Sequence, residues 1–166
     1  MEYNFELPHL PKRSKKPRKE GVTMVMDKGL SLRQAEDFLE NGKIYTDFLK
    51  LGFGSSIITN NLQEKINLYH KHGLRVYFGG TLFEAFIARN KFEDYLRLLD
   101  KFGLETAEVS DGSIEMAHDK KLEYINKLSS SRYVLSEVGS KEEGIIIHPK
   151  DRKSTRLNSS HVALSR

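Results

Sequence analysis

The sequence predicts an α/β fold in which parallel strands alternate with helices. Five apolar segments suited to strands recur at a spacing of about one strand–helix unit, and helical patterns lie between them. These segments are Thr23–Asp27, Thr46–Lys50, Leu74–Gly79, Thr106–Ser110 and Tyr133–Glu137. Repeated strand–helix–strand units require parallel strands joined by right-handed crossovers, and this is the fold class that we expect.

The helices between these strands have recognisable beginnings and ends. Three pairs have the spacing of a capping box, in which two side chains three residues apart bond each other's backbone: Ser31 with Gln34, Asn61 with Glu64, and Thr81 with Glu84. Gly73 and Gly103 each follow a last turn that contains a lysine. Both glycines are therefore expected to end a helix in the left-handed backbone conformation.

Two architectures fit five such units. A flavodoxin-like, doubly wound sheet is complete with five strands and has helices on both faces. A (β/α)8 barrel needs eight strands and about 250 residues, so strand counting alone favours the doubly wound sheet for a chain of 166 residues. Both architectures place the ligand site at the carboxyl ends of the strands.

Composition excludes several classes of protein. The chain has no cysteine, which excludes disulfides, thiolate metal ligands and cysteine nucleophiles. It has no apolar run long enough to cross a bilayer, and its first ten residues lack the pattern of a signal peptide. We therefore expect a cytoplasmic protein with no membrane partner.

Positive charge is concentrated near the amino terminus. Residues 11–19, PKRSKKPRK, carry six positive charges and no negative ones. Such a run can bind nucleic acid, but it has no interleaved aromatic residues on which bases could stack. We therefore interpret residues 1–20 as a basic, solvated arm and regard nucleic-acid binding as the less favoured alternative.

Charged or small polar residues follow every predicted strand. Glycines at such positions let backbone N–H groups approach an anion closely. The candidates for substrate binding at these ends are Gly52, Gly54, Ser55, Gly79, Gly80, Thr81 and Ser110. Lys28 and Lys50 are candidates for holding a phosphate or carboxylate and for proton transfer.

Three acidic residues at the same ends could hold a hard cation such as Mg²⁺ through oxygen ligands: Asp27, Asp111 and Glu137. Glu137 is the most informative, because a carboxylate within an apolar strand is costly unless it is paired or bound to metal. An ion pair of Asp27 with Lys28 at a surface turn is the simpler alternative for the first strand end. For Glu84, the simpler alternative is the helix cap with Thr81.

Several segments resemble phosphosulfolactate synthases, the enzymes that add sulfite to phosphoenolpyruvate. The similar segments, in order, are KPR (16–18), DKG (27–29), DFLKLGFGSS (47–56), EKI (64–66), FGGTLFE (78–84), EVSDGS (108–113) and LSEVGSK (135–141). FGGTLFE and SEVGSK are the most specific of them. Phe53 and Ser55 depart from the tryptophan and threonine that are usual in that family.

This resemblance implies a TIM barrel, a Mg²⁺ cofactor and the product (2R)-phospho-3-sulfolactate, made on a route to coenzyme M or sulfolactate. It reverses the preference from strand counting, so residues 21–150 are expected to be a barrel truncated after about five units. It makes Lys28, Lys50 and Glu137 the catalytic candidates. A Schiff-base aldolase using Lys50, a non-enzymatic heat-stress-associated protein and a homo-oligomeric parent remain open.

The last residues differ in character from the rest of the chain. DRKSTRLNSSH (151–161) resembles the conceptual translation of a common sequencing adapter, so residues 151–166 are expected to be a non-native tail. Members of the resembled family continue for three more strand–helix units. We therefore expect the polypeptide as written to be inactive or poorly folded, and its parent to be a synthase.

Overall fold

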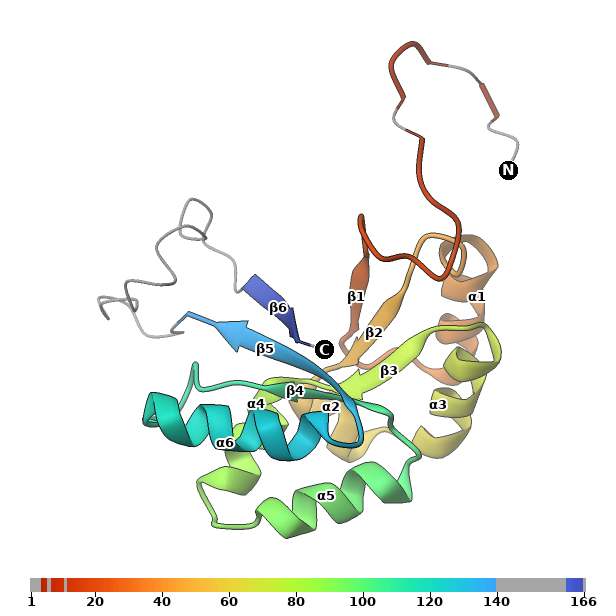
Figure 1. The fold of residues 1–166 in the computed structure, drawn as a ribbon. Helices are drawn as coiled ribbons and strands as arrows, with labels where there is room; N and C mark the ends of the chain where they lie inside the picture. The colour runs from red at the N-terminus through yellow and green to blue at the C-terminus, as the bar shows by residue number, and fades with distance from the viewer. Residues whose placement is uncertain (1–3, 6, 11, 140–160, 166) are drawn as a thin grey trace.

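The computed structural model describes residues 4–5, 7–10, 12–139 and 161–165, in which strands and helices alternate (Figure 1). The elements are β1 (Met24–Asp27), α1 (Leu32–Gly42), β2 (Phe48–Leu51), α2 (Phe53–Ile58), α3 (Leu62–Lys71), β3 (Arg75–Phe78), α4 (Gly80–Ile87), α5 (Phe92–Lys101), β4 (Thr106–Val109), α6 (His118–Ser129), β5 (Tyr133–Val138) and β6 (His161–Ser165). All five predicted strands are confirmed to within two residues at each end.

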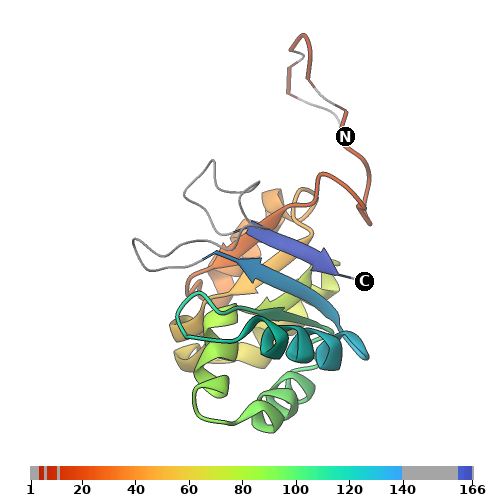
Figure 2. The same cartoon turned by 60° about the vertical axis from the view of Figure 1, so that its left-hand side comes forward.

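The strands follow chain order across a curved sheet. β1, β2 and β3 form one parallel ladder in that order, and β4 pairs in parallel with β5. β3 and β4 lie side by side and join the two ladders (Figures 1 and 2). A flavodoxin-like sheet would place β1 between β2 and β3. The doubly wound alternative is therefore wrong, because β2 is the central strand of the first ladder.

The two faces of this sheet have different partners. Alternate residues of a strand point to opposite faces. One set, which includes Leu49, Val76 and Val134, packs with helix residues in the main apolar core. The other set, represented by Phe48 and Tyr77, forms a smaller cluster that contains no helix residue. Helices thus cover the outer face, and strand side chains gather on the inner face, as in a barrel wall (Figure 1).

The helix ends confirm part of the capping prediction. Ser31 and Gln34 form the expected reciprocal pair, with N···O distances of 3.2 and 2.9 Å. Asn61 precedes α3 but has φ 55° and makes no side-chain cap, so the second capping pair is wrong. Gly73 and Gly103 have φ of +70° and +63°, which confirms that both end their helices in the left-handed conformation.

The two edges of the sheet have different strand partners. β6 pairs antiparallel with β5, whereas the next strand of a (β/α)8 barrel would be parallel. On the other side, β1 has β2 as its strand partner among the described residues, and Met24 and Met26 are each 41% exposed. Residues 151–160 lie outside the described residues, so the adapter origin of the tail stays a prediction.

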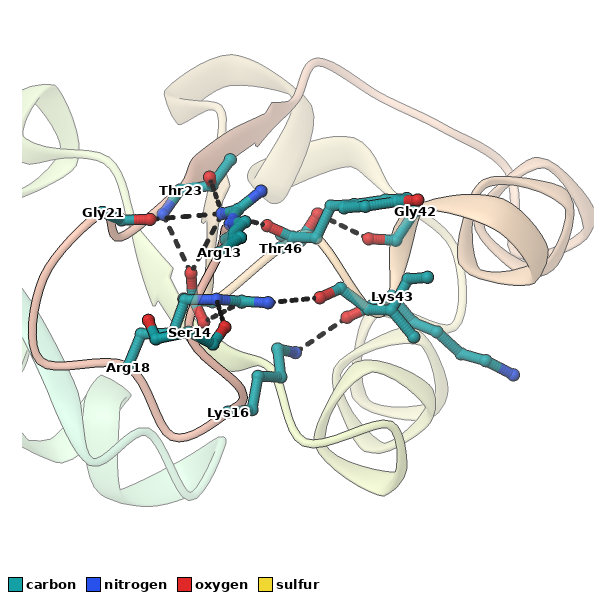
Figure 3. Close-up of polar contacts among 12 residues, drawn as sticks. Arg13, Ser14, Lys16, Arg18, Gly21, Thr23, Gly42, Lys43 and Thr46 are labelled. Carbon is teal, nitrogen blue, oxygen red and sulfur yellow. Dashed lines mark hydrogen bonds and ion pairs between the residues drawn. The ribbon is translucent and has the colours of Figure 1, made fainter. Parts of the chain in front are cut away.

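The basic arm is bound to the turn at the amino end of β2 (Figure 3). Three basic side chains of the arm donate hydrogen bonds to this turn. Arg13 donates to Tyr45 O (2.9 Å), and Lys16 donates to Lys43 O (2.8 Å). Arg18 donates to Ile44 O (2.7 Å) and to Asp47 Oδ1 (2.8 Å). The carboxylate of Asp47 is only 9% exposed and also accepts a hydrogen bond from the Thr23 N–H. Arg13 is exposed although it is hydrogen-bonded, whereas Lys16 and Arg18 are partly buried, so the interpretation as a solvated arm is wrong for Lys16 and Arg18.

Replacement of Arg18 tests this attachment. Arg18→Met is expected to lower the free energy of unfolding by about 2 kcal/mol, because it leaves the buried Asp47 without its closest cation. Urea denaturation measures the effect. Lys15→Met, at an exposed position of the same arm, should change stability by no more than about 0.5 kcal/mol. Equal effects of the two substitutions would show that the arm adds nothing specific.

Candidate functional site

Four polar side chains lie on the inner face of the sheet, toward the carboxyl ends of its strands. Lys50 and Tyr77 are paired in the β2–β3 register, so their side chains leave the same face. Lys50 lies two residues beyond Phe48, which belongs to the inner apolar cluster. Glu108 of β4 and Glu137 of β5 complete the set, which we call the inner polar layer.

Lys50 is held between the two glutamates of this layer. Its Nζ lies 2.8 Å from Glu108 Oε1 and 3.6 Å from Glu137 Oε2. The other oxygen of Glu108 accepts a hydrogen bond of 2.8 Å from the Gly80 N–H. The lysine side chain is 11% exposed, and both carboxylates are buried. A buried ammonium that is already paired with two carboxylates can bind an anionic ligand only if it also keeps, or exchanges, these partners, or if a cation offsets their negative charge.

The electrostatics single out Glu108. Burial raises the pKa of this carboxyl, the charge and hydrogen bond of Lys50 oppose that rise, and the nearby charge of Glu137 adds to it. The net pKa is above the ordinary value for a glutamate. A buried acid with a raised pKa beside a lysine, at the ligand end of a parallel sheet, has the properties of a site residue.

Two glycines allow α4 to approach this layer. A Cβ atom on Gly79 would lie 3.0 Å from Lys50 Cε, and one on Gly80 would lie 2.5 Å from Ser110 Cβ. The helix begins at Gly80, with Gly79 as its capping residue. The Gly80 N–H, which was predicted to donate to a substrate, donates to Glu108 in this structure.

The Thr81–Glu84 capping pair is wrong. Thr81 is the second residue of α4, so it does not precede the helix. Glu84 instead accepts a hydrogen bond from the hydroxyl of Ser110, and Ser110 Oγ accepts one of 3.3 Å from the Gly112 N–H. Both side chains are buried. Ser110 therefore links the loop after β4 to α4 beside the inner polar layer.

Asp27 lies on the opposite face from Lys50. It is in register with Leu51, which packs in the helix-facing core. The side chain is buried, and its partners are Lys65 Nζ (2.8 Å), Tyr69 Oη (2.9 Å), Gly29 N (2.8 Å) and Leu30 N (2.7 Å). Its ion pair is with Lys65 of α3, so the predicted surface pair with Lys28 is wrong.

The pKa of Asp27 reflects this environment. Burial alone would raise it, but hydrogen bonds from Lys65, the two backbone N–H groups and Tyr69 hold it below its usual value. Burial and the negative charge of Asp27 raise the pKa of the Tyr69 hydroxyl. Asp27 therefore anchors the loop after β1 to α3 as a permanent carboxylate at neutral pH.

The three predicted metal ligands are not brought together. Asp111 Oδ1 pairs with Lys121 Nζ at 2.6 Å, and the same amine donates to the Glu137 carbonyl oxygen at 2.7 Å. Asp27 is on the other face of the sheet. Within the described residues, no group of three His, Cys, Asp or Glu side chains could hold a metal ion.

The loops after β1 and β2 adjoin at the same rim. The Gly52 N–H donates to the Asp27 carbonyl oxygen at 2.9 Å, and Ser55 Oγ donates to the Gly52 carbonyl oxygen at 3.1 Å. Lys28 is exposed beside them. A Cβ atom on Gly54 would meet nothing within 4 Å, so this predicted binding residue faces open space.

Hollows with volumes of about 340 and 470 Å³ lie at the opposite rim, where β3 and β4 begin. Both are lined by Arg75, Glu105 and Thr106. They are separate from the inner polar layer, because these residues precede Tyr77 and Glu108 on their strands.

Comparison with known proteins decides the family. The model of the (2R)-phospho-3-sulfolactate synthase family matches residues 11–163. The chain belongs to this family. Phosphosulfolactate synthases of Bacillus subtilis and Methanothermobacter thermautotrophicus are 39% identical over 133 residues and 38% identical over 147 residues, which are 80% and 86% of this chain. That of Methanocaldococcus jannaschii is 40% identical over 124 residues, or 73% of the chain.

Membership of the phosphosulfolactate synthase family confirms the resemblance seen in the sequence. The matched regions cover 53%, 57% and 49% of these three relatives, so the chain spans about half of their length. The expected α/β class with parallel strands is also confirmed. Among the described residues, no helix is long and apolar enough to cross a membrane.

The sequence prediction for this phosphosulfolactate synthase relative missed Glu108, Lys65 and Lys121. Glu108 lies within the apolar strand TAEV, so the reasoning that selected Glu137 applies equally to it. Lys65 adjoins Ile66 and lies one turn before Tyr69 on the buried side of α3, where a lysine also needs a partner. Its partner, Asp27, could not be read from the local pattern.

Asp27→Asn tests the anchor beneath the first loop. The substitution leaves the buried Lys65 without a counter-charge, so the free energy of unfolding should fall by about 3 kcal/mol at pH 7. Because the folded pKa of Asp27 is lowered, its contribution is present above its unfolded pKa of about 3.9 and is lost as pH falls through the folded value. Urea denaturation across pH should show this acid-dependent loss in the wild type and less of it in Asp27→Asn. The exposed Asp37→Asn should retain the wild-type profile.

Gly80→Ala tests the close approach of α4. Its new methyl group would overlap Ser110 Cβ, which should lower the free energy of unfolding by about 1–3 kcal/mol. Gly54→Ala is the matched control, because it also adds one methyl group to a helical glycine but in open space. Thermal denaturation should show no loss for Gly54→Ala. A Gly80→Ala protein as stable as that control would rule out tight packing at this helix start.

Proposed function

We propose that this chain is the amino-terminal part of a phosphosulfolactate synthase, a (β/α)8 enzyme that adds sulfite to phosphoenolpyruvate. The observation that carries the proposal is Lys50, held between Glu108 and Glu137 on the inner face of a parallel sheet in a member of this family. The half-length match to the relatives supports the view that further strands complete the barrel.

The reaction needs an anion clamp and a proton. The sulfur lone pair of hydrogensulfite forms a bond to the methylene carbon of phosphoenolpyruvate, and the electrons of its double bond move toward the carboxylate. The adjacent carbon then takes a proton, and no group leaves, giving (2R)-phospho-3-sulfolactate. Lys50 suits both the clamp and the delivery of that proton. Lys28, exposed on the same rim, is the second candidate for binding the anionic substrate.

Mg²⁺ fits part of this arrangement. In protein sites Mg²⁺ commonly uses one or two carboxylates, with waters and substrate oxygens completing its shell. Glu108 and Glu137 are the inner-face carboxylates that could hold it, with Glu108 exchanging contacts with Lys50 or the Gly80 N–H, whereas Asp27 lies on the opposite face of the sheet. When bound, the cation would offset the negative charge that develops on the substrate carboxylate. Asp111 would need to exchange its partner Lys121 to take part.

The two alternative functions are less well supported by this geometry. A Schiff-base aldolase needs a free amine, and Lys50 is ion-paired with two carboxylates. A non-enzymatic, heat-stress-associated protein gives no reason to bury a lysine and two glutamates together. The proposed enzyme is cytoplasmic and supplies a route to sulfolactate or coenzyme M.

The decisive experiment uses the full-length parent with Mg²⁺, phosphoenolpyruvate and sulfite. Formation of phosphosulfolactate, followed by ³¹P NMR, is expected, and Lys50→Met should lower kcat/KM by about 100- to 10,000-fold. Lys71→Met, at an exposed position on α3, is the matched control and should retain activity. Circular dichroism establishes that each variant is folded.

Two results would go against the proposal, and a third would overturn a separate expectation about the short chain. An inactive wild-type parent would exclude the synthase, and trapping of substrate on Lys50 by borohydride would favour the aldolase. Residues 1–166 alone are expected to form no product, because they correspond to about half of a relative. Product from this shorter chain would overturn that last expectation.

A further inference from the structure

Tyr77 contributes a buried hydroxyl group to the inner polar layer. Its side chain is fully buried, and its Oη has no hydrogen-bond partner among the described residues. The ring meets Phe48 edge-on, with centroids 6.4 Å apart, within the inner apolar cluster. Its pairing with Lys50 in the β2–β3 register directs both side chains to the same face.

A buried tyrosine hydroxyl without a hydrogen bond lowers the stability of the folded protein, and a phenylalanine at the same position would not have this cost. Burying such a group without a hydrogen bond costs about 1–3 kcal/mol, and most buried polar groups are paired. The surrounding cluster is aromatic and aliphatic, so a phenylalanine at this position would pack equally well. At this place beside Lys50, the hydroxyl is available to donate to a ligand when the site is occupied.

The charges nearby favour a donor at this position. Burial, followed by the negative charges of Glu108 and Glu137, raises the pKa of the Tyr77 hydroxyl, so the group stays protonated. A neutral O–H donor adds no negative charge to a layer that already contains two carboxylates and one ammonium. It can therefore bind an anionic oxygen where a further carboxylate would repel it.

We propose that the Tyr77 hydroxyl donates a hydrogen bond to a carboxylate or phosphate oxygen of the substrate that Lys50 holds. The inference rests on the proposed function and adds a binding residue to the same site. Lys50 supplies the charge, and Tyr77 supplies a directional donor on the neighbouring strand. This pair would orient the anion relative to Glu108 and Glu137.

Tyr95 provides a matched control within the chain. Its hydroxyl is also fully buried and lacks a hydrogen-bond partner among the described residues. It belongs to α5, however, and its ring packs against Phe83 and Phe86 in the helix-facing core. Tyr77→Phe and Tyr95→Phe thus remove the same atom from two equally buried places, of which only one adjoins Lys50.

The test measures activity and stability of the full-length parent. Tyr77→Phe should lower kcat/KM for phosphoenolpyruvate by about 10- to 100-fold. It should also weaken the rise in Tm that phosphoenolpyruvate produces. Its free energy of unfolding without substrate should be unchanged or higher, because no hydrogen bond is lost. Tyr95→Phe should keep kcat/KM within about twofold and should retain the full Tm shift.

Each other outcome overturns the inference. If the parent is active and Tyr77→Phe behaves like Tyr95→Phe, the hydroxyl does not contact substrate, while the synthase proposal stands. If Tyr77→Phe loses stability without substrate, its hydroxyl serves the fold rather than the ligand. If the wild-type parent neither forms product nor gains Tm with phosphoenolpyruvate, the proposed function fails and this inference falls with it.

Discussion

The ion pair of Lys50 with Glu108 is the interaction on which the arrangement of the site depends. It crosses from the ladder of β1, β2 and β3 to the ladder of β4 and β5, which share no continuous hydrogen-bonded pairing. Removing either partner would leave the other without its closest counter-charge in the interior, which is costly. The same contact that joins the two halves of the sheet therefore also fixes the amine at the carboxyl ends of the strands.

The pleat of the strands then directs the charged side chains to opposite faces of the sheet. Lys50 points to the inner face, and Asp27, which is in register with the adjacent residue Leu51, points to the helices. The inner group joins side chains from β2, β4 and β5. The outer group ties a loop to α3 through four contacts on one carboxylate. Residues that look alike in the sequence, each at a strand end, thus lie on different faces: Lys50 on the face of the proposed ligand site, and Asp27 on the face where it anchors a loop.

The sequence predicted those features that depend on local pattern. The strands could be recognised because apolar runs ended at turn residues. The Ser31 cap could be recognised because its partner, Gln34, is only three residues away. Thr81 failed as a cap because Gly79 and Gly80 already begin the helix, so that α4 can pack against Ser110. Partners distant in sequence, such as Lys65 for Asp27, depend on how α3 packs on the sheet and could not be predicted locally. Family resemblance predicted a barrel, whereas strand counting alone favoured the doubly wound sheet.

The basic arm shows why charge along a sequence is a weak guide to a partner. Three of the six positively charged residues in the segment 11–19 donate hydrogen bonds to the turn before β2: Arg13, Lys16 and Arg18. Half of these charges therefore make contacts inside the protein. Each of the three donates to a backbone carbonyl oxygen, which carries no formal charge and leaves no mark in the composition, and Arg18 also pairs with the Asp47 carboxylate. The number of positive charges counted in the sequence therefore overstates the number that can contact a polyanion such as nucleic acid. What the arm provides instead is a fixed position for the turn before β2, next to the paired amino ends of β1 and β2.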